Sequence, residues 1–129
     1  MAADGAKVKP NRPSTARAGH PSGAAMADPV RDPEDCRSMA EVRAGVDALD
    51  AELLQLLARR FGYMRAAARI KPDREQVRDE ARKVEVIANA VALAKEWGLP
   101  ADTVEALWER LVEASIAYEM EAWERKHRL

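Results

Sequence analysis

Two basic side chains occupy positions where an expected helix of this chain is apolar. Arg60 falls on a stripe of apolar residues, between Leu57 and Met64. Lys71 follows eleven residues after Arg60, so at about 100° and 1.5 Å per residue the two side chains share a face, about 16 Å apart along the axis. A cation on a core stripe costs stability unless a counter-charge meets it. The spacing therefore predicts either structural ion pairs or an anion held between these two side chains.

Further polar residues near apolar stripes allow the same two interpretations. Arg43 precedes Arg60 by seventeen residues, which puts the two about 25 Å apart on one helix. One chain cannot bring both to a small ligand, whereas an antiparallel dimer could bring Arg43 of a second copy close to Arg60. Further along, Ser115 and Glu119 are four residues apart and share a helix face. A rim carboxylate that pairs with Arg or Lys is the simpler interpretation of Glu119.

Three segments with a helical period have to position these residues. Apolar residues recur at steps of three and four over 38–70, from 73 or 74 to 97, and from about 100–102 to 126. None of these segments shows the period-two alternation of a half-buried strand. The sequence therefore predicts an all-α fold, a three-helix chain with one long N-terminal helix.

Local signals mark the ends of these helices. Ser38 and Glu41 have the spacing of a capping box, in which Ser38 caps the first helix and Glu41 reaches back. Pro72 and Pro100 mark breaks, and Gly98 suits the position just after a helix end. The first helix is then roughly 33 residues or about 50 Å long. Two shorter helices cannot cover its whole stripe in a compact monomer, so we expect two long helices to pair in a dimer.

The start of the chain has a different composition from the rest. Residues 1–32 hold three of the six glycines and four of the seven prolines, with almost no large apolar side chains, so we expect a disordered tail followed by one helical domain over 33–129. Met26 is an alternative start of translation. The basic residues of the tail leave its role open, with a passive tail as the simplest interpretation.

Composition argues against several classes of function. The formal net charge is −1 and the pI is about 6.2, which argues against nucleic acid as a partner. Cys36 is the single cysteine, and both histidines, His20 and His127, lie in expected tails; we expect no disulfide and no Cys/His metal site. No apolar run approaches the ~18 residues of a membrane span, and no secretory signal is visible. We therefore expect a cytoplasmic protein that does not interact with membranes.

The residues above belong to a longer pattern that resembles a known family. The pattern includes Pro33-Glu34-Asp35-Cys36, Met39-Ala40-Glu41-Val42-Arg43, Leu56-Leu57-Ala58-Arg59-Arg60-Phe61, Ala66-Ala67-Ala68-Arg69-Ile70-Lys71, Val77-Arg78-Asp79-x-x-Arg82, Glu96-Trp97-Gly98-Leu99, Ile116-x-x-Glu119 and Trp123. It is similar to the all-helical chorismate mutase family, and most similar to the branch that contains the isochorismate-pyruvate lyases. The resemblance covers residues 33 to about 125.

The resemblance implies a fold and a site. The fold is an intertwined homodimer with two equivalent sites for a dianionic substrate, chorismate or isochorismate, and it needs no cofactor and no metal. Arg60 and Arg82 would hold the substrate's carboxylates, and Lys71 would donate to the ether oxygen. Arg43 would reach into the partner's site. The implied catalytic residues are Arg60, Lys71 and Glu119, and the implied substrate-binding residues are Arg43, Asp79, Arg82, Lys83 and Ser115.

This chain departs from the family pattern at two positions. Glu119 stands where many members carry a glutamine that donates to the ether oxygen. An ionised carboxylate cannot donate, so we expect burial to keep Glu119 protonated and activity to favour acidic pH. Lys83 stands where mutases often place a glutamate for the substrate's ring hydroxyl, which favours the lyase branch. Asp79 keeps the preceding acidic position of the mutases.

The function that these residues favour first is the rearrangement of chorismate to prephenate. The alternatives are cleavage of isochorismate to salicylate and pyruvate, an aminodeoxychorismate mutase, and a non-catalytic helical dimer. Replacing Arg60 or Lys71 with Met separates the last of these from the enzymes. An enzyme should lose activity while its fold survives, whereas a purely structural cation should be replaceable without loss of any ligand response.

Overall fold

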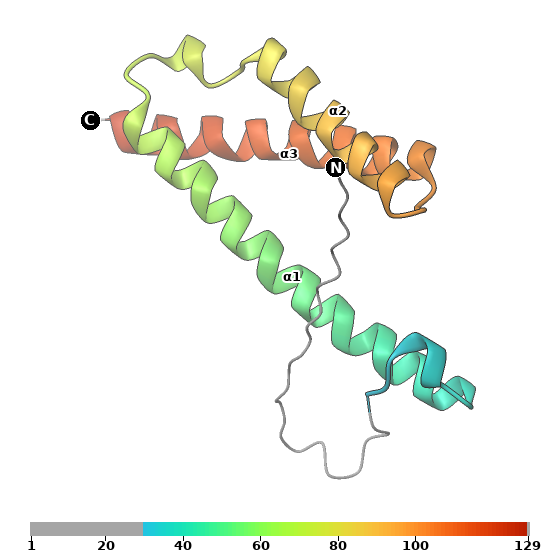
Figure 1. The fold of residues 1–129 in the computed structure, drawn as a ribbon. Helices are drawn as coiled ribbons and strands as arrows, with labels where there is room; N and C mark the ends of the chain where they lie inside the picture. Colours follow the sequence, from blue (N-terminus) through green and yellow to red (C-terminus); the bar gives the residue numbers. More distant parts are fainter. Residues whose placement is uncertain (1–29, 129) are drawn as a thin grey trace. The chain divides into compact units, whose positions relative to one another are not determined.

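The computed structural model describes residues 30–128, all of whose regular structure is helical (Figure 1). The elements in chain order are η4 (Pro33–Asp35), α1 (Met39–Ile70), η5 (Arg74–Gln76), α2 (Glu80–Glu96) and α3 (Ala101–His127). Between residues 30 and 128 there is no strand, so the predicted all-α class with three helices and a long first helix is confirmed. Most of the predicted N-terminal tail, residues 1–29, lies outside the described residues.

The chain divides into two compact units, Met1–Leu53 and Leu54–Leu129. In the first unit, Ser38 Oγ accepts a hydrogen bond from Glu41 N at 3.2 Å, as the predicted cap requires. The Glu41 carboxylate does not reach back to Ser38. It accepts from Arg37 N at 2.7 Å and from Arg31 Nε at 2.8 Å, and these contacts lower the pKa of Glu41. The Glu41 carboxylate thus accepts from the backbone N–H of Arg37, one residue before the N–H of Ser38 that a capping box would use.

In the second unit, α2 packs along α3, and η5 lies against α3. The buried apolar residues are small: Ala68, Val77, Ala94 and Val112. Short side chains let helix backbones approach closely, which fits the close packing of α2 along α3. Two polar residues are equally buried, and both lie on α3. They are Ser115 and Glu119, which the sequence had already marked as site candidates.

The second helix begins later than predicted. The apolar period suggested one helix from residue 73 or 74, but the chain forms the short helix η5 and then an extended turn before α2. Asp79 is the cause of the later start, because its Oδ1 accepts from Arg82 N at 3.0 Å and caps α2. Val77, only 3% exposed, closes the turn against the rest of the unit. The prediction of one continuous helix was therefore wrong at its start.

The ends of α2 and α3 follow the local signals. Gly98 has a φ of +71°, the left-handed conformation that glycine adopts without strain. The following residue, Leu99, donates its N–H to Ala94 O at 2.8 Å, which satisfies a carbonyl of the last turn of α2. Pro100 then precedes α3. In residues 30–128 no helix has both the length and the apolar character needed to cross a membrane.

Candidate active site

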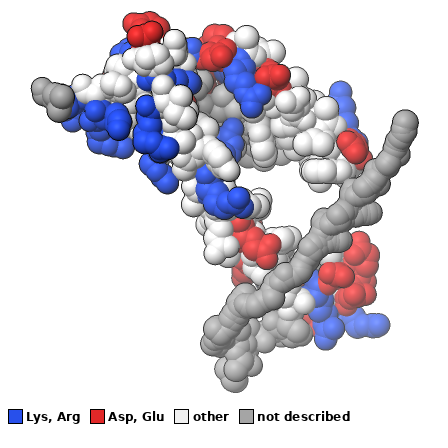
Figure 2. Space-filling view, turned by 60° about the vertical axis from the view of Figure 1, so that its left-hand side comes forward, with Lys and Arg blue, Asp and Glu red and all other residues white. Residues whose placement is uncertain are grey.

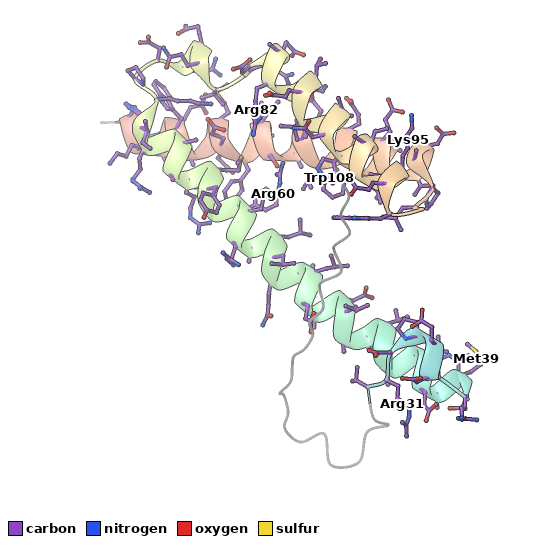
Figure 3. The ribbon with its side chains drawn as sticks, in the orientation of Figure 1. Arg31, Met39, Arg60, Arg82, Lys95 and Trp108 are labelled. Carbon is purple, nitrogen blue, oxygen red and sulfur yellow. The ribbon has the colours of Figure 1, made fainter. Side chains whose placement is uncertain are left out.

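Arg60 of α1 and Arg82 of α2 flank one hollow of about 300 Å³ in the second unit. Figure 3 shows that these two side chains and Trp108 come from three different helices. The residues that line the hollow are Arg60, Arg82, Val86, Asn89, Ala90, Leu93 and Trp108. A mainly apolar hollow with two cations at its rim is a suitable shape for a small organic anion.

Arg60 is oriented by a neutral partner. Its Nη1 donates to Ser115 Oγ at 2.7 Å. That hydroxyl donates in turn to Leu111 O, one helical turn earlier, also at 2.7 Å. Because Ser115 gives its proton to the backbone, its lone pairs face the guanidinium. Ser115 is 3% exposed, so a buried side chain of α3 fixes the direction of Arg60 without neutralising its charge.

The hollow has an excess of positive charge. Burial, together with the positive charge of Arg82, lowers the pKa of Arg60. Arg82 has a carboxylate partner, Glu85, at 2.7 Å, but that pair is exposed to solvent. Among the described residues no carboxylate lies within ion-pair distance of Arg60. An arginine stays protonated despite this environment, so the hollow presents positive charge that an anion would satisfy.

Lys71 and Glu119 form a second polar group next to the first. Lys71 Nζ lies 2.7 Å from Glu119 Oε2 and donates to Val77 O at 3.4 Å. Glu119 is 4% exposed, and its Oε2 is paired by charge but accepts no hydrogen bond within residues 30–128. Glu119 lies one turn after Ser115 on α3, a spacing of about 5–6 Å between Cβ atoms. The structure thus brings the Arg60–Ser115 and Lys71–Glu119 contacts to consecutive turns of α3.

Several residues of the hollow were missed from the sequence. Val86, Asn89 and Leu93 follow Arg82 on α2 at helical steps, and Trp108 faces them from α3. The signal was present, because steps of three and four from a candidate arginine mark one helix face. Helical spacing shows which residues share a face, but it does not show whether that face lines a hollow or packs closely against another helix.

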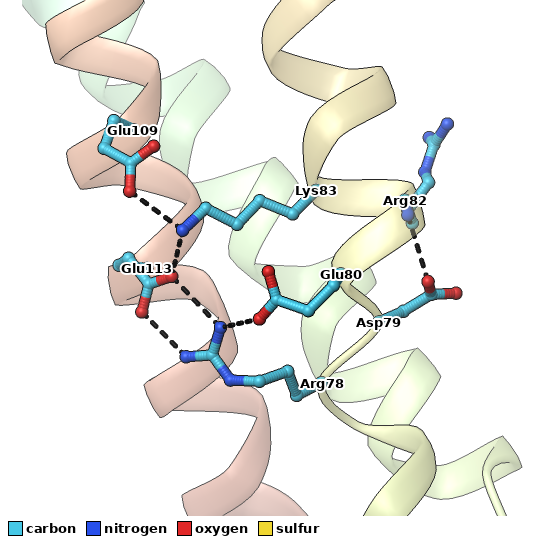
Figure 4. Close-up of polar contacts among 7 residues, drawn as sticks. All are labelled: Arg78, Asp79, Glu80, Arg82, Lys83, Glu109 and Glu113. Atoms are coloured by element: carbon cyan, nitrogen blue, oxygen red, sulfur yellow. Dashed lines mark hydrogen bonds and ion pairs between the residues drawn. The ribbon is translucent and has the colours of Figure 1, made fainter.

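Lys83 lies in a different, fully paired cluster between α2 and α3 (Figure 4). Its ammonium contacts Glu109 at 2.8 Å and Glu113 at 2.5 Å. Arg78 pairs with Glu113 at 2.8 Å and with Glu80 at 2.6 Å. These contacts raise the pKa values of Arg78 and Lys83 and lower the pKa of Glu113 to about 2. We name these five residues the paired cluster.

The remaining predicted site residues occupy other places. Asp79 uses its carboxylate to cap α2, and Lys83 belongs to the paired cluster, so substrate binding by these two residues stays a prediction. Arg43 lies on the part of α1 that belongs to the first unit, where it is exposed. Its predicted role in a partner's site also stays a prediction.

A second hollow, of about 380 Å³, lies between the last turns of α1 and α3. It is lined by Arg65, Ala68, Arg69, Ala122, Arg125 and Lys126. Lys and Arg side chains gather around this end of the chain in the space-filling view (Figure 2). Helix C-termini favour cations because the peptide dipoles leave partial negative charge there. The basic character of this hollow therefore has a structural explanation that needs no ligand.

Comparison with known proteins shows which family the chain belongs to. A family model described as chorismate mutase type II matches residues 42–120, which include Arg43, Arg60, Lys71, Arg82 and Glu119. The chain belongs to the chorismate mutase type II family. This finding confirms the family predicted from the sequence and the prediction of an enzyme of that type.

A curated relative of this chorismate mutase family member comes from Pseudomonas aeruginosa and is named isochorismate pyruvate lyase. The two are 31% identical over 94 residues, which cover 73% of this chain and 93% of the relative. This relative agrees with the resemblance to the branch of isochorismate-pyruvate lyases that the sequence pattern indicated.

Proposed function

We propose that this chain catalyses the rearrangement of chorismate to prephenate in the hollow between Arg60 and Arg82. The observation that carries this proposal is the pair of mutually repelling guanidiniums at one hollow, with no carboxylate on Arg60 among the described residues. A substrate with two carboxylates supplies the missing negative charge. Membership of the chorismate mutase type II family supports this choice of dianion.

The proposed chemistry needs positioning and charge stabilisation. In the pericyclic step the ether C–O bond breaks while a C–C bond forms within the same molecule, so no nucleophile and no external reactant take part. Arg60, held by Ser115, binds one carboxylate in a bidentate pair, and Arg82 binds the other. The reactive conformer is selected in this way. Lys71 donates to the ether oxygen as negative charge grows on it, and Glu119 lies 2.7 Å from the same ammonium.

The test is a direct comparison of substrates. The purified full chain is given chorismate and isochorismate separately between pH 5 and 8, and the products are separated by chromatography. Prephenate from chorismate, with little salicylate from isochorismate, supports the proposal. Inertness toward both substrates would reject it and favour the amino substrate or a non-catalytic helical dimer.

A second candidate function is cleavage of isochorismate to salicylate and pyruvate. The name of the Pseudomonas aeruginosa relative favours it. So does Lys83, a cation at the position where mutases often carry a glutamate for the ring hydroxyl. The same assay decides, because rapid release of salicylate and pyruvate with only slow prephenate formation would make the chain a lyase with residual mutase activity.

We further propose that the enzyme is a homodimer in which Arg43 of each chain completes the partner's site. The support is the apolar stripe in the first unit, where Val46, Leu49 and Leu53 are each half exposed or more. Such a stripe on a long helix is typically covered by another helix. A cytoplasmic location remains part of this proposal, on the composition of the chain alone.

A further inference from the structure

Trp123 on α3 contacts the residue whose ammonium the proposed mechanism uses. Its indole Nε1 donates to the backbone carbonyl of Lys71 at 3.0 Å. The carbonyls of the last turn of a helix have no partner within the helix, and Lys71 follows directly after α1 ends at Ile70. Trp123 therefore satisfies an acceptor that would otherwise be left without a partner at a half-buried place.

The same face of α3 contacts Lys71 at both ends. Glu119 lies 2.7 Å from the Lys71 ammonium, and Trp123, four residues later, holds the carbonyl. Residues four apart lie on one helix face. A lysine side chain has four rotatable bonds and a compact charge that adopts many positions. Fixing both its backbone and its charged end restricts those positions far more than either contact alone.

The surroundings of both groups limit their movement. Pro72 disfavours helical backbone angles at Lys71, so the chain must turn away from α1 at this residue. The Trp123 ring is stacked on His127, with ring centroids 3.9 Å apart and planes inclined by 19°. The His127 Nδ1 in turn lies 2.9 Å from the carbonyl of Trp123. The indole N–H is thus held in the direction of the Lys71 carbonyl.

We propose that Trp123 is a positioning residue that fixes the Lys71 backbone so that the ammonium stays beside the reacting oxygen. This inference rests on the role proposed above for Lys71. Without the indole N–H, the Lys71 carbonyl rotates toward water, and the start of the connection between α1 and α2 rotates with it. Displacements of about 1 Å at a reacting group cost up to ~100-fold in rate.

The experiment removes the N–H and keeps an aromatic side chain. Trp123→Phe is assayed with the substrate that the wild-type chain converts, and kcat, KM and Tm are measured together. We expect kcat to fall about 10-fold or more, with KM within about 3-fold of wild type, because substrate carboxylates still meet both arginines. A variant with 3-benzothienylalanine at position 123 replaces the N–H by sulfur at nearly constant shape and should show the same loss.

Glu124→Gln is the matched control. Glu124 ties Arg74 to α3 at 2.9 Å through an exposed pair next to Trp123. Exposed pairs contribute little, so this variant should keep wild-type kcat and KM. Loss of activity in Glu124→Gln equal to that in Trp123→Phe would mean that any disturbance of this end of α3 matters, and it would overturn the inference.

Two other results would also overturn it. One is a kcat of either Trp123 variant within about 3-fold of wild type, and the other is a loss in kcat matched by an equal rise in KM or by a large fall in Tm. Failure of the proposed function looks different. In that case the wild-type chain is inert toward both substrates, or Lys71→Met is as active as wild type, whereas an inactive Lys71→Met beside a fully active Trp123→Phe rejects only the inference.

Discussion

The hollow at Arg60 and the paired cluster at Lys83 both contain cations of the second unit, but these cations have different partners. In the paired cluster, Arg78 and Lys83 meet three carboxylates at distances of 2.5–2.8 Å. At the hollow, the Arg60 guanidinium hydrogen-bonds only the hydroxyl of Ser115 within residues 30–128, and burial and then the positive charge of Arg82 lower its pKa.

This difference separates two uses of the same residue types. Opposite charges that pair between α2 and α3 join the helices and leave no unpaired cation for an anionic ligand to neutralise. The two guanidiniums at the hollow repel each other, and burial and then the charge of Arg82 lower the pKa of Arg60. Charged side chains with perturbed pKa values are concentrated at functional sites, where a bound ligand can supply the opposite charge. The comparison therefore supports the proposal that the hollow binds the substrate, whereas the paired cluster joins α2 to α3.

The largest expected effect comes from removing one cation from each region. Arg60→Met should lower kcat/KM by about 10³-fold or more, because a preorganised donor to the substrate is lost. Its Tm should stay equal or rise, because like-charge repulsion and a half-buried cation are removed. Steady-state kinetics and thermal unfolding of the same samples check both parts.

Arg78→Met is the matched variant of the paired cluster. It should keep kcat/KM within a few-fold of wild type and lower Tm by a few degrees, since Glu113 loses its main partner. The comparison breaks if Arg78→Met is as inactive as Arg60→Met, or if Arg60→Met retains activity.

The parts of the fold that could be predicted depend on neighbouring residues in the sequence. Ser38, Gly98 and Pro100 act through their own backbone and hydrogen bonds, and the helix ends they mark were found within one or two residues. The start of α2 was missed although Asp79 is an ordinary capping residue. Val77 lies before α2 but is spaced so that it continues the apolar period of that helix. The uninterrupted period therefore predicted one helix and hid the start that Asp79 caps.

The candidate site was only partly accessible from the sequence. Arg60 and Lys71 stood out because cations on an apolar stripe are rare. Helical spacing marked Ser115 and Glu119 as neighbours, and the family pattern supplied Arg82 and the roles of all five residues. Partners could not be predicted, because Arg60 and Ser115 are 55 residues apart and their contact depends on how α1 packs against α3. The same limit applies to the ion pairs of Lys83, which form across 26 and 30 residues.

Mixing two inactive variants tests whether the hollow, unlike the paired cluster, needs a residue of a second copy. Arg43→Met and Arg60→Met should each be nearly inactive alone. In a mixed dimer, one site takes Arg60 from the first variant and Arg43 from the second and is intact. Unfolding and refolding the two together should therefore restore about a quarter of wild-type activity, since half the dimers are mixed and each has one intact site. No recovery despite dimers in light scattering would place Arg43 outside the partner's site.

Glu119→Gln has a smaller expected effect and sharpens the role of the Glu119 carboxylate, which is buried near the hollow. The sequence predicts that wild-type activity rises toward acidic pH, because only a protonated Glu119 can donate to the ether oxygen. Glutamine donates at any pH, so the variant should be about as active as wild type at pH 5 and more active at pH 8. The measurement is kcat/KM between these two pH values. A variant whose pH profile matches wild type would show that Glu119 serves as a counter-charge to Lys71, the arrangement seen at 2.7 Å.

The smallest expected effect concerns the pH dependence of the paired cluster. Arg78 and then Lys83 lower the pKa of Glu113 from 4.5 to about 2. A carboxylate with a lowered pKa in the folded state stabilises the fold fully above its unfolded value, and that stability is lost as the pH falls through the folded value. Glu113→Gln should therefore lower Tm by a few degrees at pH 6, and this difference from wild type should vanish as the pH approaches 2.

Salt gives an independent check on the same variant. The charges around Glu113 are partly exposed, so screening at about 1 M salt should reduce the Tm difference at pH 6. The difference between Arg60→Met and wild type should show no comparable loss between pH 6 and pH 2, because no carboxylate among the described residues faces Arg60. A Tm difference for Glu113→Gln that persists at pH 2 would mean that the side chain acts through packing and not through charge. In that case the ion pairs of Glu113 would not be what stabilises the paired cluster.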